Sequence, residues 1–355
     1  MKKKLKKYKR KDIRNSFFKK YFLIFLIILF DFRILKIRKK IYNEFQPKIS
    51  IFLPIYNKAN FLRRSIRSIQ IQTLVDIEII AVNDCSEDNS LEVLKKMAKA
   101  DSRIKIINND RNRGLLYSRA MGILNSKGKY IMNLDPDDEL ADPENLKFLF
   151  KIIYKLKVDV ISYGLIIKKE GRILTKHFLC SKFKNIQFQP EILDSNTDIF
   201  DFLITNKLIK RELFKKAYIL FKEKIYGEKW NYAEDEIWSC LINKLANSKI
   251  CVEKAIYIYH INNYSLINNK KNILYFKNLI FWIEMLKKIF INNNKMIYLN
   301  KINHLITLIK KKNYLTIIKN NSEIKDKYIN LFKKFNFNIS KDNSSFKNNI
   351  NLLLN

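Results

Sequence analysis

The 355-residue chain is poor in the residue types that many catalytic and metal-binding motifs require. It contains six glycines, five prolines, four cysteines and three histidines. It has no glycine-rich phosphate loop, CxxC pair, HxxxH pair or Ser/His/Asp pattern, which excludes the common zinc and triad enzymes. The four cysteines are scattered and give no disulfide framework. This usage is typical of a reducing cytoplasm rather than of a secreted protein.

Acidic residues are also scarce, and the charge balance limits the possible partners. The chain has 34 Asp and Glu against 69 Lys and Arg, a net charge of +35. A nucleic-acid-binding function needs basic residues grouped within a known reader motif, and no such motif is present. We therefore expect no nucleic-acid partner. The chain is rich in Lys, Ile and Asn throughout, so a general compositional bias is one explanation of the charge. The alternative is that the charge serves to attract the protein to an anionic membrane surface.

The N-terminal segment favours the membrane explanation. Residues 1–20 carry eleven Lys or Arg, and residues 21–30 are an unbroken run of ten apolar residues. A spanning helix needs about 20 apolar residues, and no small-residue cleavage site of a signal peptide follows. We expect an interfacial anchor with basic flanks at the cytoplasmic face of a membrane. A short signal-anchor and an extension without a membrane role remain alternatives.

The next part of the chain alternates regularly between two hydrophobic periods. Short apolar runs predict strands at 48–53, 77–82, 103–107 and 130–133, and helical spacing predicts helices at 59–72, 89–99 and 115–124. Strands and helices that alternate with short connections form βαβ units and a parallel sheet. Further on, the pattern predicts a hairpin of residues 159–167 and 172–178, a helical patch around 206–208 and a helix beginning near 234.

An acidic turn follows the fourth predicted strand. Residues 134–139 read Leu-Asp-Pro-Asp-Asp-Glu. Ligands of open α/β sheets bind outside the carboxyl ends of the strands, and crowded carboxylates repel one another unless a cation joins them. A hard divalent cation takes oxygens from such carboxylates and from a substrate phosphate. The alternative is a solvated turn that caps the next helix.

Several motifs occur together in a fixed order. They are Pro-Ile-Tyr-Asn at 54–57, Asn-Asp-Cys-Ser-Glu-Asp at 83–88, Asn-Arg-Gly at 112–114, Ser-Arg-Ala-Met-Gly at 118–122, Gly-Lys-Tyr-Ile at 128–131 and Asp-Pro-Asp-Asp at 135–138. In this order and spacing, residues from about 47 to 264 resemble the family 2 glycosyltransferases. The resemblance implies a GT-A fold, which is α/β and Rossmann-like with a mostly parallel sheet, and inverting sugar transfer from a nucleotide-sugar.

The resemblance also implies roles for individual residues. The donor's nucleoside would lie against Pro54, Tyr56, Asn57, Asp84 and Asp88. Asp135 and Asp137 would form the DxD pair that reaches the diphosphate through Mn²⁺ or Mg²⁺, and Arg119 would pair with a phosphate. His260 would complete the metal or diphosphate shell, although a histidine after an aromatic strand is also compatible with a purely structural role.

Two positions depart from the family pattern. Asn83 and Cys85 stand where the family often has Asp and Gly. Asn83 removes one negative charge, so Asp84 must supply the charge of this motif. Cys removes the residue that adopts positive φ without strain. We expect Cys85 to be a small buried residue rather than a reactive thiol. Both changes affect the preference for base and donor.

The second half supplies a candidate base. Residues 233–238 read Ala-Glu-Asp-Glu-Ile-Trp and resemble the Glu-Asp motif near the family's acceptor site. Inverting transfer needs a carboxylate that takes the acceptor hydroxyl's proton, so Asp235 is the first candidate and Glu234 the second. No protein acid is needed, because a metal-bound diphosphate leaves well. The alternative is that these carboxylates only favour a helix N-terminus through its dipole.

These observations predict three parts and one activity. Residues 1–46 form the basic and apolar extension, 47–268 the GT-A domain and 269–355 a helical region. We expect metal-dependent transfer from a UDP-sugar to a hydroxyl of a glycan or lipid-linked acceptor, in surface polysaccharide synthesis. The alternatives are transfer to polyprenyl phosphate and a non-catalytic protein, either a scaffold or a basic nucleic-acid binder.

Overall fold

The computed structural model describes residues 46–177, 203–226 and 234–262. Every described helix and strand lies in the unit Pro47–Asn355. The predicted N-terminal anchor and the predicted helical region from 269 onward lie outside the described residues.

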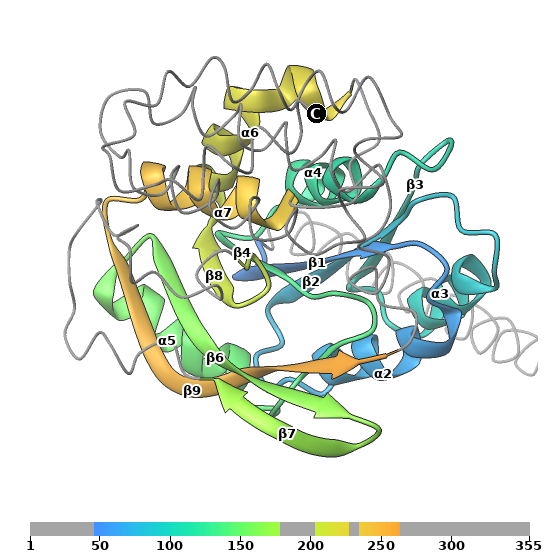
Figure 1. Cartoon of the computed structure of the whole chain (residues 1–355), viewed down its shortest axis with the longest axis horizontal. Coiled ribbons are helices and arrows are strands. Elements are labelled where there is room, and N and C mark those ends of the chain that lie inside the picture. Colours follow the sequence, from blue (N-terminus) through green and yellow to red (C-terminus); the bar gives the residue numbers. More distant parts are fainter. Residues whose placement is uncertain (1–45, 178–202, 227–233, 263–355) are drawn as a thin grey trace, which may run out of the picture. The chain divides into compact units, whose positions relative to one another are not determined.

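A mixed sheet forms the centre of this unit (Figure 1). The strands are β1 (Ile49–Ile55), β2 (Ile77–Asn83), β3 (Ile104–Asn108), β4 (Tyr130–Asn133), β5 (Glu139–Leu140), β6 (Val160–Lys169), β7 (Arg172–His177), β8 (Lys207–Lys210) and β9 (Lys249–Ile261). Their order is β3-β2-β1-β4-β8-β6-β9-β5, with β7 paired to β6. The first four strands are parallel, so their carboxyl ends share one edge. The predicted alternation and the predicted shared edge are confirmed.

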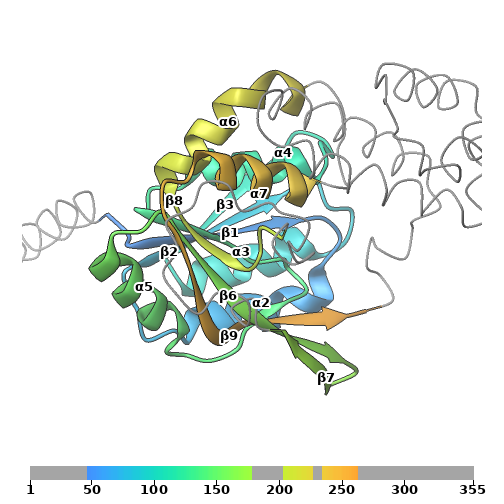
Figure 2. The ribbon, with the colours of Figure 1, turned by 60° about the vertical axis from the view of Figure 1, so that its left-hand side comes forward.

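Helices cover both faces of the sheet (Figures 1 and 2). They are α2 (Ala59–Gln70), α3 (Ser90–Ala100), α4 (Leu115–Asn125), α5 (Asn145–Leu156), α6 (Arg211–Ile225) and α7 (Glu234–Leu245). Apolar residues of α2, α3 and α5 form one core cluster, and those of α4, α6 and α7 form another. All residues of β1, β2 and β4 are buried between these layers, as expected for parallel strands covered on both faces.

One glycine of the predicted motifs has a packing role. A Cβ at Gly122 on α4 would lie 2.8 Å from the side chain of Phe52 on β1. No larger residue fits without displacing the aromatic ring. Gly122 therefore lets α4 pack closely against the centre of the sheet.

The prediction of a helical patch around residues 206–208 is wrong. Residues Lys207–Lys210 form β8, which lies between β4 and β6 and is antiparallel to both. Lys207 is fully buried in this strand. Pairing with two neighbouring strands decides the structure here, because four residues are too few for the hydrophobic period to indicate helix or strand.

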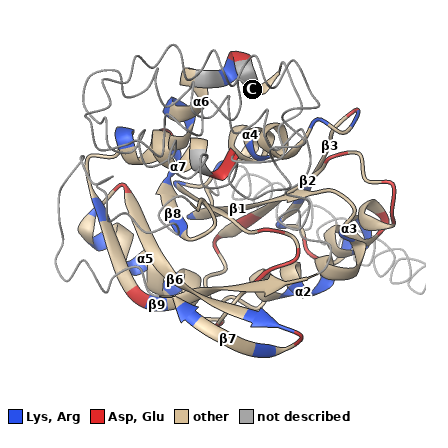
Figure 3. Ribbon diagram, in the orientation of Figure 1, with Lys and Arg blue, Asp and Glu red and all other residues tan. Residues whose placement is uncertain are grey.

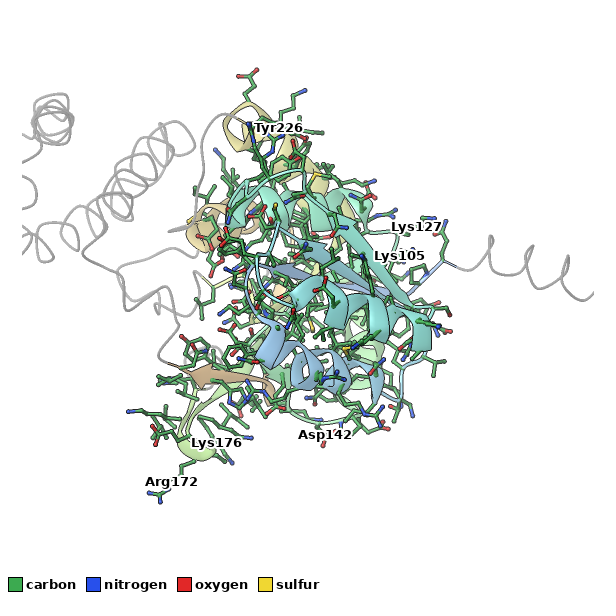
Figure 4. All side chains as sticks on the ribbon, turned by 90° about the vertical axis from the view of Figure 1, so that its right-hand side faces the viewer. Lys105, Lys127, Asp142, Arg172, Lys176 and Tyr226 are labelled. Atoms are coloured by element: carbon green, nitrogen blue, oxygen red, sulfur yellow. The ribbon has the colours of Figure 1, made fainter. Side chains whose placement is uncertain are left out.

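The predicted hairpin is present and projects from the sheet (Figure 3). Its turn consists of Glu170 and Gly171, which both have positive φ, of 49° and 80°. Two positive-φ residues in a two-residue loop match the right-handed twist of the flanking strands. The side chains of Arg172 and Lys176 extend away from the rest of the fold (Figure 4).

Candidate active site

Hydrogen bonds join the turns that follow β1 and β2. The Asn57 N–H donates to Ser86 Oγ (3.1 Å), and Asn57 Oδ1 accepts the Glu87 N–H (2.8 Å). Pro54 is buried in β1, whereas Tyr56 is 39% exposed at the edge. The structure therefore brings Pro54, Tyr56 and Asn57 to the edge where the strands end, and leaves an aromatic ring accessible there.

Asp84 joins two turns at the edge of the sheet. Its carboxylate is buried and accepts three hydrogen bonds, from Asn109 Nδ2 (2.7 Å), the Arg113 N–H (2.9 Å) and the Gly114 N–H (2.8 Å). These bonds hold the turn after β3 against the turn after β2. The predicted contact of Asp84 with the nucleoside stays a prediction.

Asp88 joins the beginnings of two helices. Its carboxylate accepts the Ala59 N–H at the start of α2 (2.9 Å) and the Ser90 N–H at the start of α3 (3.0 Å). Burial raises the pKa of Asp88, but the hydrogen bonds from Ser90 and Ala59 outweigh this and leave it below its ordinary value. The carboxylate is exposed, so its predicted contact with the nucleoside stays a prediction.

The cysteines differ from expectation. Cys85 has φ 57°, so the position uses the left-handed conformation for which the family has Gly. The expected burial of Cys85 is wrong, because the residue is exposed. Cys251 on β9 is disulfide-bonded, whereas the scattered cysteines predicted no disulfide.

The acidic turn after β4 is held by the backbone of His260 and by two residues that sequence reasoning did not identify, Arg64 and Tyr257. Arg64 on α2 donates to the Asp137 carbonyl, and the Asp135 N–H donates to Tyr257 Oη (3.2 Å). Asp138 accepts the Tyr257 hydroxyl (2.6 Å) and the His260 N–H (2.8 Å). Burial, followed by repulsion from the two other aspartates of the turn, raises the pKa of Asp138 well above its ordinary value. α2 and β9 therefore fix the shape of the turn.

The two residues of the predicted DxD pair have different partners. Asp135 accepts Asn133 Nδ2 (2.9 Å) and lies 3.3 Å from a guanidinium nitrogen of Arg119. Asp137 Oδ2 accepts Lys58 Nζ (2.6 Å) and Asn262 Nδ2 (3.0 Å). Lys58 directly follows the Pro-Ile-Tyr-Asn motif, which was the available sequence signal for its position.

Arg119 forms the centre of the site. Its side chain is 2% exposed, and Nη2 lies 2.8 Å from Asp235, 3.3 Å from Asp135 and 3.5 Å from Glu234. Burial lowers the pKa of Arg119, but these three carboxyl groups raise it more, so the guanidinium stays charged. Its predicted pairing with a donor phosphate stays a prediction.

The candidate base and its neighbour occupy the first turn of α7, as predicted. The side chain of Glu234 is 5% exposed and that of Asp235 is 23% exposed. Burial, and then repulsion from Asp235, raise the pKa of Glu234 well above its ordinary value. Glu234 therefore holds its proton more tightly than a free glutamate does, and Asp235 is the more accessible of the two carboxyl groups.

His260 does not take the predicted place in a metal shell. Its Nε2 donates to Glu139 Oε1 (2.9 Å), and Lys168 Nζ lies 3.7 Å from the same oxygen. The hydrogen bond from His260 lowers the pKa of Glu139. Among the described residues, no group of three or more His, Cys, Asp or Glu side chains is arranged to hold a metal ion. The three-ligand set of Asp135, Asp137 and His260 is therefore not assembled.

The remaining carboxylates still suit a metal that is shared with a substrate. Mg²⁺ is usually bound through one or two carboxylates together with substrate phosphates. Within the described ranges, no donor reaches Asp137 Oδ1. Burial, and then repulsion from neighbouring carboxylates, raise the pKa of Asp135 and Asp138, and a bound cation would relieve this repulsion. Asp135 and Asp137 thus fit a divalent cation that is completed by an anionic ligand.

Comparison with known proteins identifies this arrangement. Residues 50–217 match the model of the family described as glycosyl transferase family 2. Over these residues the chain is similar to this family. It is 32% identical to the uncharacterized glycosyltransferase EpsJ of Bacillus subtilis over 231 residues, which are 62% of this chain and 63% of EpsJ. It is 29% identical to the GalNAc(5)-diNAcBac-PP-undecaprenol beta-1,3-glucosyltransferase of Campylobacter jejuni, with 61% and 65% of the two chains covered. The alignments thus span less than two thirds of each relative.

Solved structures of glycosyltransferases share the fold of this chain. S. aureus TarS 1–349 in complex with UDP-GlcNAc superposes with a TM-score of 0.58 at 18% identity, covering 79% of this chain and 83% of that one. Mannosyltransferase PcManGT from Pyrobaculum calidifontis, in complex with GDP-Man and Mn²⁺, gives 0.50 at 12% identity, with coverage of 87% and 85%. The predicted GT-A fold is confirmed. No helix among the described residues has the length and apolar character needed to cross a membrane.

Proposed function

We propose that this protein transfers a sugar from a nucleotide-sugar, most simply a UDP-sugar, to a hydroxyl group of a glycan or lipid-linked acceptor, with inversion at the anomeric carbon. One observation carries the proposal. The guanidinium of Arg119 joins Asp135, at the end of β4, to Asp235, at the start of α7. The proposed donor-side carboxylate and the candidate base, 100 residues apart in sequence, thus both lie within 3.3 Å of one nitrogen of a buried cation.

In the proposed reaction, Asp235 acts as the general base. It accepts the proton of the acceptor hydroxyl while that oxygen forms a bond to the donor's anomeric carbon and the bond to the diphosphate breaks. Asp235 suits this role because its side chain is more exposed than that of Glu234, whose pKa is raised by burial and then by repulsion from Asp235. Arg119 holds the Asp235 carboxylate in place and balances its charge.

The donor side requires a cation, which Asp135 and Asp137 would hold. When bound, Mn²⁺ or Mg²⁺ would neutralise the charge that develops on the leaving diphosphate. The chain's own contribution is to fix the backbone of these two residues. Arg64 donates to the Asp137 carbonyl, and the Asp135 N–H donates to Tyr257 Oη. Such fixed, preorganised charge supplies a large part of the rate enhancement in many enzymes.

The compared proteins support the choice of substrates. TarS is described in complex with UDP-GlcNAc and PcManGT in complex with GDP-Man and Mn²⁺. The C. jejuni relative is named for an acceptor linked to undecaprenol through diphosphate. A lipid-linked acceptor would also agree with an N-terminal segment that binds a membrane at its cytoplasmic face.

Calorimetry of nucleotide binding tests the proposal. UDP, GDP and CDP are titrated into the full-length protein with and without Mn²⁺. We expect Mn²⁺-dependent binding of UDP, and loss of this dependence in Asp137→Ala, because that change removes a proposed metal ligand. Folded protein that binds none of the three nucleotides would contradict the donor site. Full turnover by Asp137→Ala in excess chelator would contradict the metal dependence.

A further inference from the structure

Lys58 occupies a position that the proposed reaction does not use. Its ammonium group lies 2.6 Å from Asp137 Oδ2, and the two side chains are 19% and 16% exposed. Asp137 is one of the two carboxylates proposed to hold the metal. A cation of the chain itself therefore neutralises this carboxylate when no metal is bound.

The backbone of Lys58 is fixed, whereas its ammonium group can move. The Lys58 N–H donates to Ser90 Oγ (2.9 Å), and its carbonyl accepts the N–H groups of Phe61 and Leu62 in the first turn of α2. The side chain passes over the Phe61 ring, with Nζ 5.5 Å from the ring centre. A lysine ammonium sits on a flexible four-carbon stem. It can leave Asp137 without any rearrangement of the helix or of the donor edge.

The other cations around the acidic turn have different partners. The guanidinium of Arg119 pairs with Asp135, and Glu139 pairs with His260 and Lys168. Arg64 donates to the backbone carbonyl of Asp137 and not to its carboxylate. Among the described residues, Lys58 is therefore the cation that pairs with the Asp137 carboxylate. A metal ion that binds Asp137 has to displace this ammonium group or lie beside it.

We propose that Lys58 acts as a stand-in cation that makes metal binding depend on the donor's diphosphate. This inference rests on the proposed function. Without nucleotide, a divalent ion competes with the ammonium group for Asp137 and is repelled by it. With nucleotide, the diphosphate supplies negative charge for the metal and for the released ammonium group alike. Metal and diphosphate therefore bind cooperatively, and a free metal ion binds weakly.

The test measures metal binding in the absence of nucleotide. Mn²⁺ is titrated into full-length wild type and Lys58→Met, and free Mn²⁺ is followed by its electron paramagnetic resonance signal. We expect Lys58→Met to bind Mn²⁺ more tightly than wild type, by about 5-fold or more, the lower end of typical coupling between two sites. The factor by which Mn²⁺ improves UDP affinity should fall correspondingly in the variant, because coupling is reciprocal.

Two further variants separate this role from simpler ones. Lys58→Arg keeps the charge and should bind Mn²⁺ as weakly as wild type. Lys96→Met removes one positive charge from the exposed surface of α3 and should change nothing. A lysine that only binds phosphate predicts no change in nucleotide-free Mn²⁺ affinity, and a structural lysine predicts a loss of it. Either result in folded Lys58→Met overturns the inference.

The same measurements distinguish failure of the inference from failure of the proposed function. Mn²⁺-dependent UDP binding by wild type supports the proposed function whatever Lys58→Met does. If wild type binds UDP with Mn²⁺ while Lys58→Met leaves nucleotide-free Mn²⁺ binding unchanged, the stand-in role alone is overturned. If folded wild type binds no nucleotide, the proposed function fails and the role of Lys58 fails with it.

Discussion

At the scale of single residues, the site has one buried guanidinium and more carboxylates than it can balance. Arg119 lies near Asp135, Glu234 and Asp235. Three ionised carboxylates around one cation would leave uncompensated negative charge in a buried environment, which is costly. Burial, and then repulsion from Asp235, raise the pKa of Glu234, which reduces this cost because a protonated carboxyl group carries no charge. We therefore expect the two neighbouring carboxyl groups to have different roles.

This difference predicts the activity of two matched variants. Glu234→Gln resembles the protonated acid in shape and charge, so we expect its kcat to stay within about tenfold of wild type. Asp235→Asn removes the proposed base and should lower kcat by about 10²- to 10⁴-fold, the usual contribution of general base catalysis. Steady-state transfer to a hydroxyl acceptor measures both. Indifference of turnover to Asp235→Asn would instead favour a phosphate acceptor, which needs no strong base.

The raised pKa of Glu234 also predicts how the free energy of unfolding depends on pH. Because its pKa is raised on folding, the folded state keeps a proton that the unfolded state releases near pH 4.5. The contribution of this carboxyl group to the free energy of unfolding is fully present below its pKa in the unfolded state. It is lost as the pH rises towards the pKa of Glu234 in the folded state. Gln cannot ionise, so Glu234→Gln should lose less stability than wild type as pH rises from about 5 to about 8. The difference should be on the order of 1 kcal/mol or more, because a tenfold difference in proton affinity between the two states corresponds to about 1.4 kcal/mol.

Urea unfolding of both proteins at the two pH values provides this measurement. Glu212→Gln on α6, where the side chain is 59% exposed, serves as the control and should follow wild type. Equal pH dependence in wild type and Glu234→Gln would show that Glu234 is ionised in the folded protein.

Cys85 gives a second prediction at this scale. A non-glycine residue in the left-handed conformation costs about 1–2 kcal/mol, and part of this is offset because Gly has more freedom in the unfolded chain. Cys85→Gly should therefore raise the free energy of unfolding by about 0.5–1 kcal/mol, measured by urea denaturation. Cys85→Ser keeps the conformational cost and should match wild type. A lower stability of Cys85→Gly would show that the thiol makes a stabilising contact.

The sequence predicted that most site residues lie at one edge of the sheet but did not predict their partners within the protein. The resemblance implies that Asp84 contacts a nucleoside, and it does not reveal the three donors from the turn after β3. It likewise does not reveal that Arg119 contacts Glu234, which lies 115 positions away in sequence. A residue's position along a helix or strand follows from the local pattern. Its partners depend on which distant segments the fold brings beside it.

At the scale of secondary-structure elements, β9 is as important to the donor side as the acidic turn itself. It pairs with β6 and β5 and carries Tyr257 and His260, which both bind Asp138. The first four strands were predictable because each is a short apolar run bounded by polar turns. The contribution of Tyr257 was not, because an aromatic residue in a strand usually indicates only core packing.

A pair of tyrosine variants tests this role of β9. Tyr257→Phe removes the hydroxyl that donates to Asp138 and accepts the Asp135 N–H. Tyr163→Phe removes a hydroxyl that donates to the Thr205 carbonyl in the core. Each change leaves a buried polar group without its partner and should lower stability by about 1–3 kcal/mol. We expect only Tyr257→Phe to weaken Mn²⁺-dependent UDP binding as well, by calorimetry. Equal UDP affinity in the two variants would limit Tyr257 to a packing role.

At the scale of the whole molecule, the sequence predicts features that lie outside the described residues. The basic and apolar segment of residues 1–46 is expected to bind an anionic membrane surface, with a contribution of about 1 kcal/mol per basic residue near the surface. Full-length protein should therefore sediment with membranes at low ionic strength and be partly released by high salt, because salt screens charge but not apolar burial. Fractionation that finds the protein fully soluble at low salt would contradict peripheral attachment.

The link between Tyr257 and Asp138 also has a consequence for biosynthesis. These residues are 119 positions apart, so the acidic turn leaves the ribosome well before the strand that holds it. At about 5–20 residues per second, this interval lasts roughly 6–24 s. During that time the turn has no hydrogen bond from β9, and its crowded carboxylates are exposed to water. The nascent chain can therefore complete its parallel strands early, but its donor-binding edge matures only after residue 260 has been synthesised.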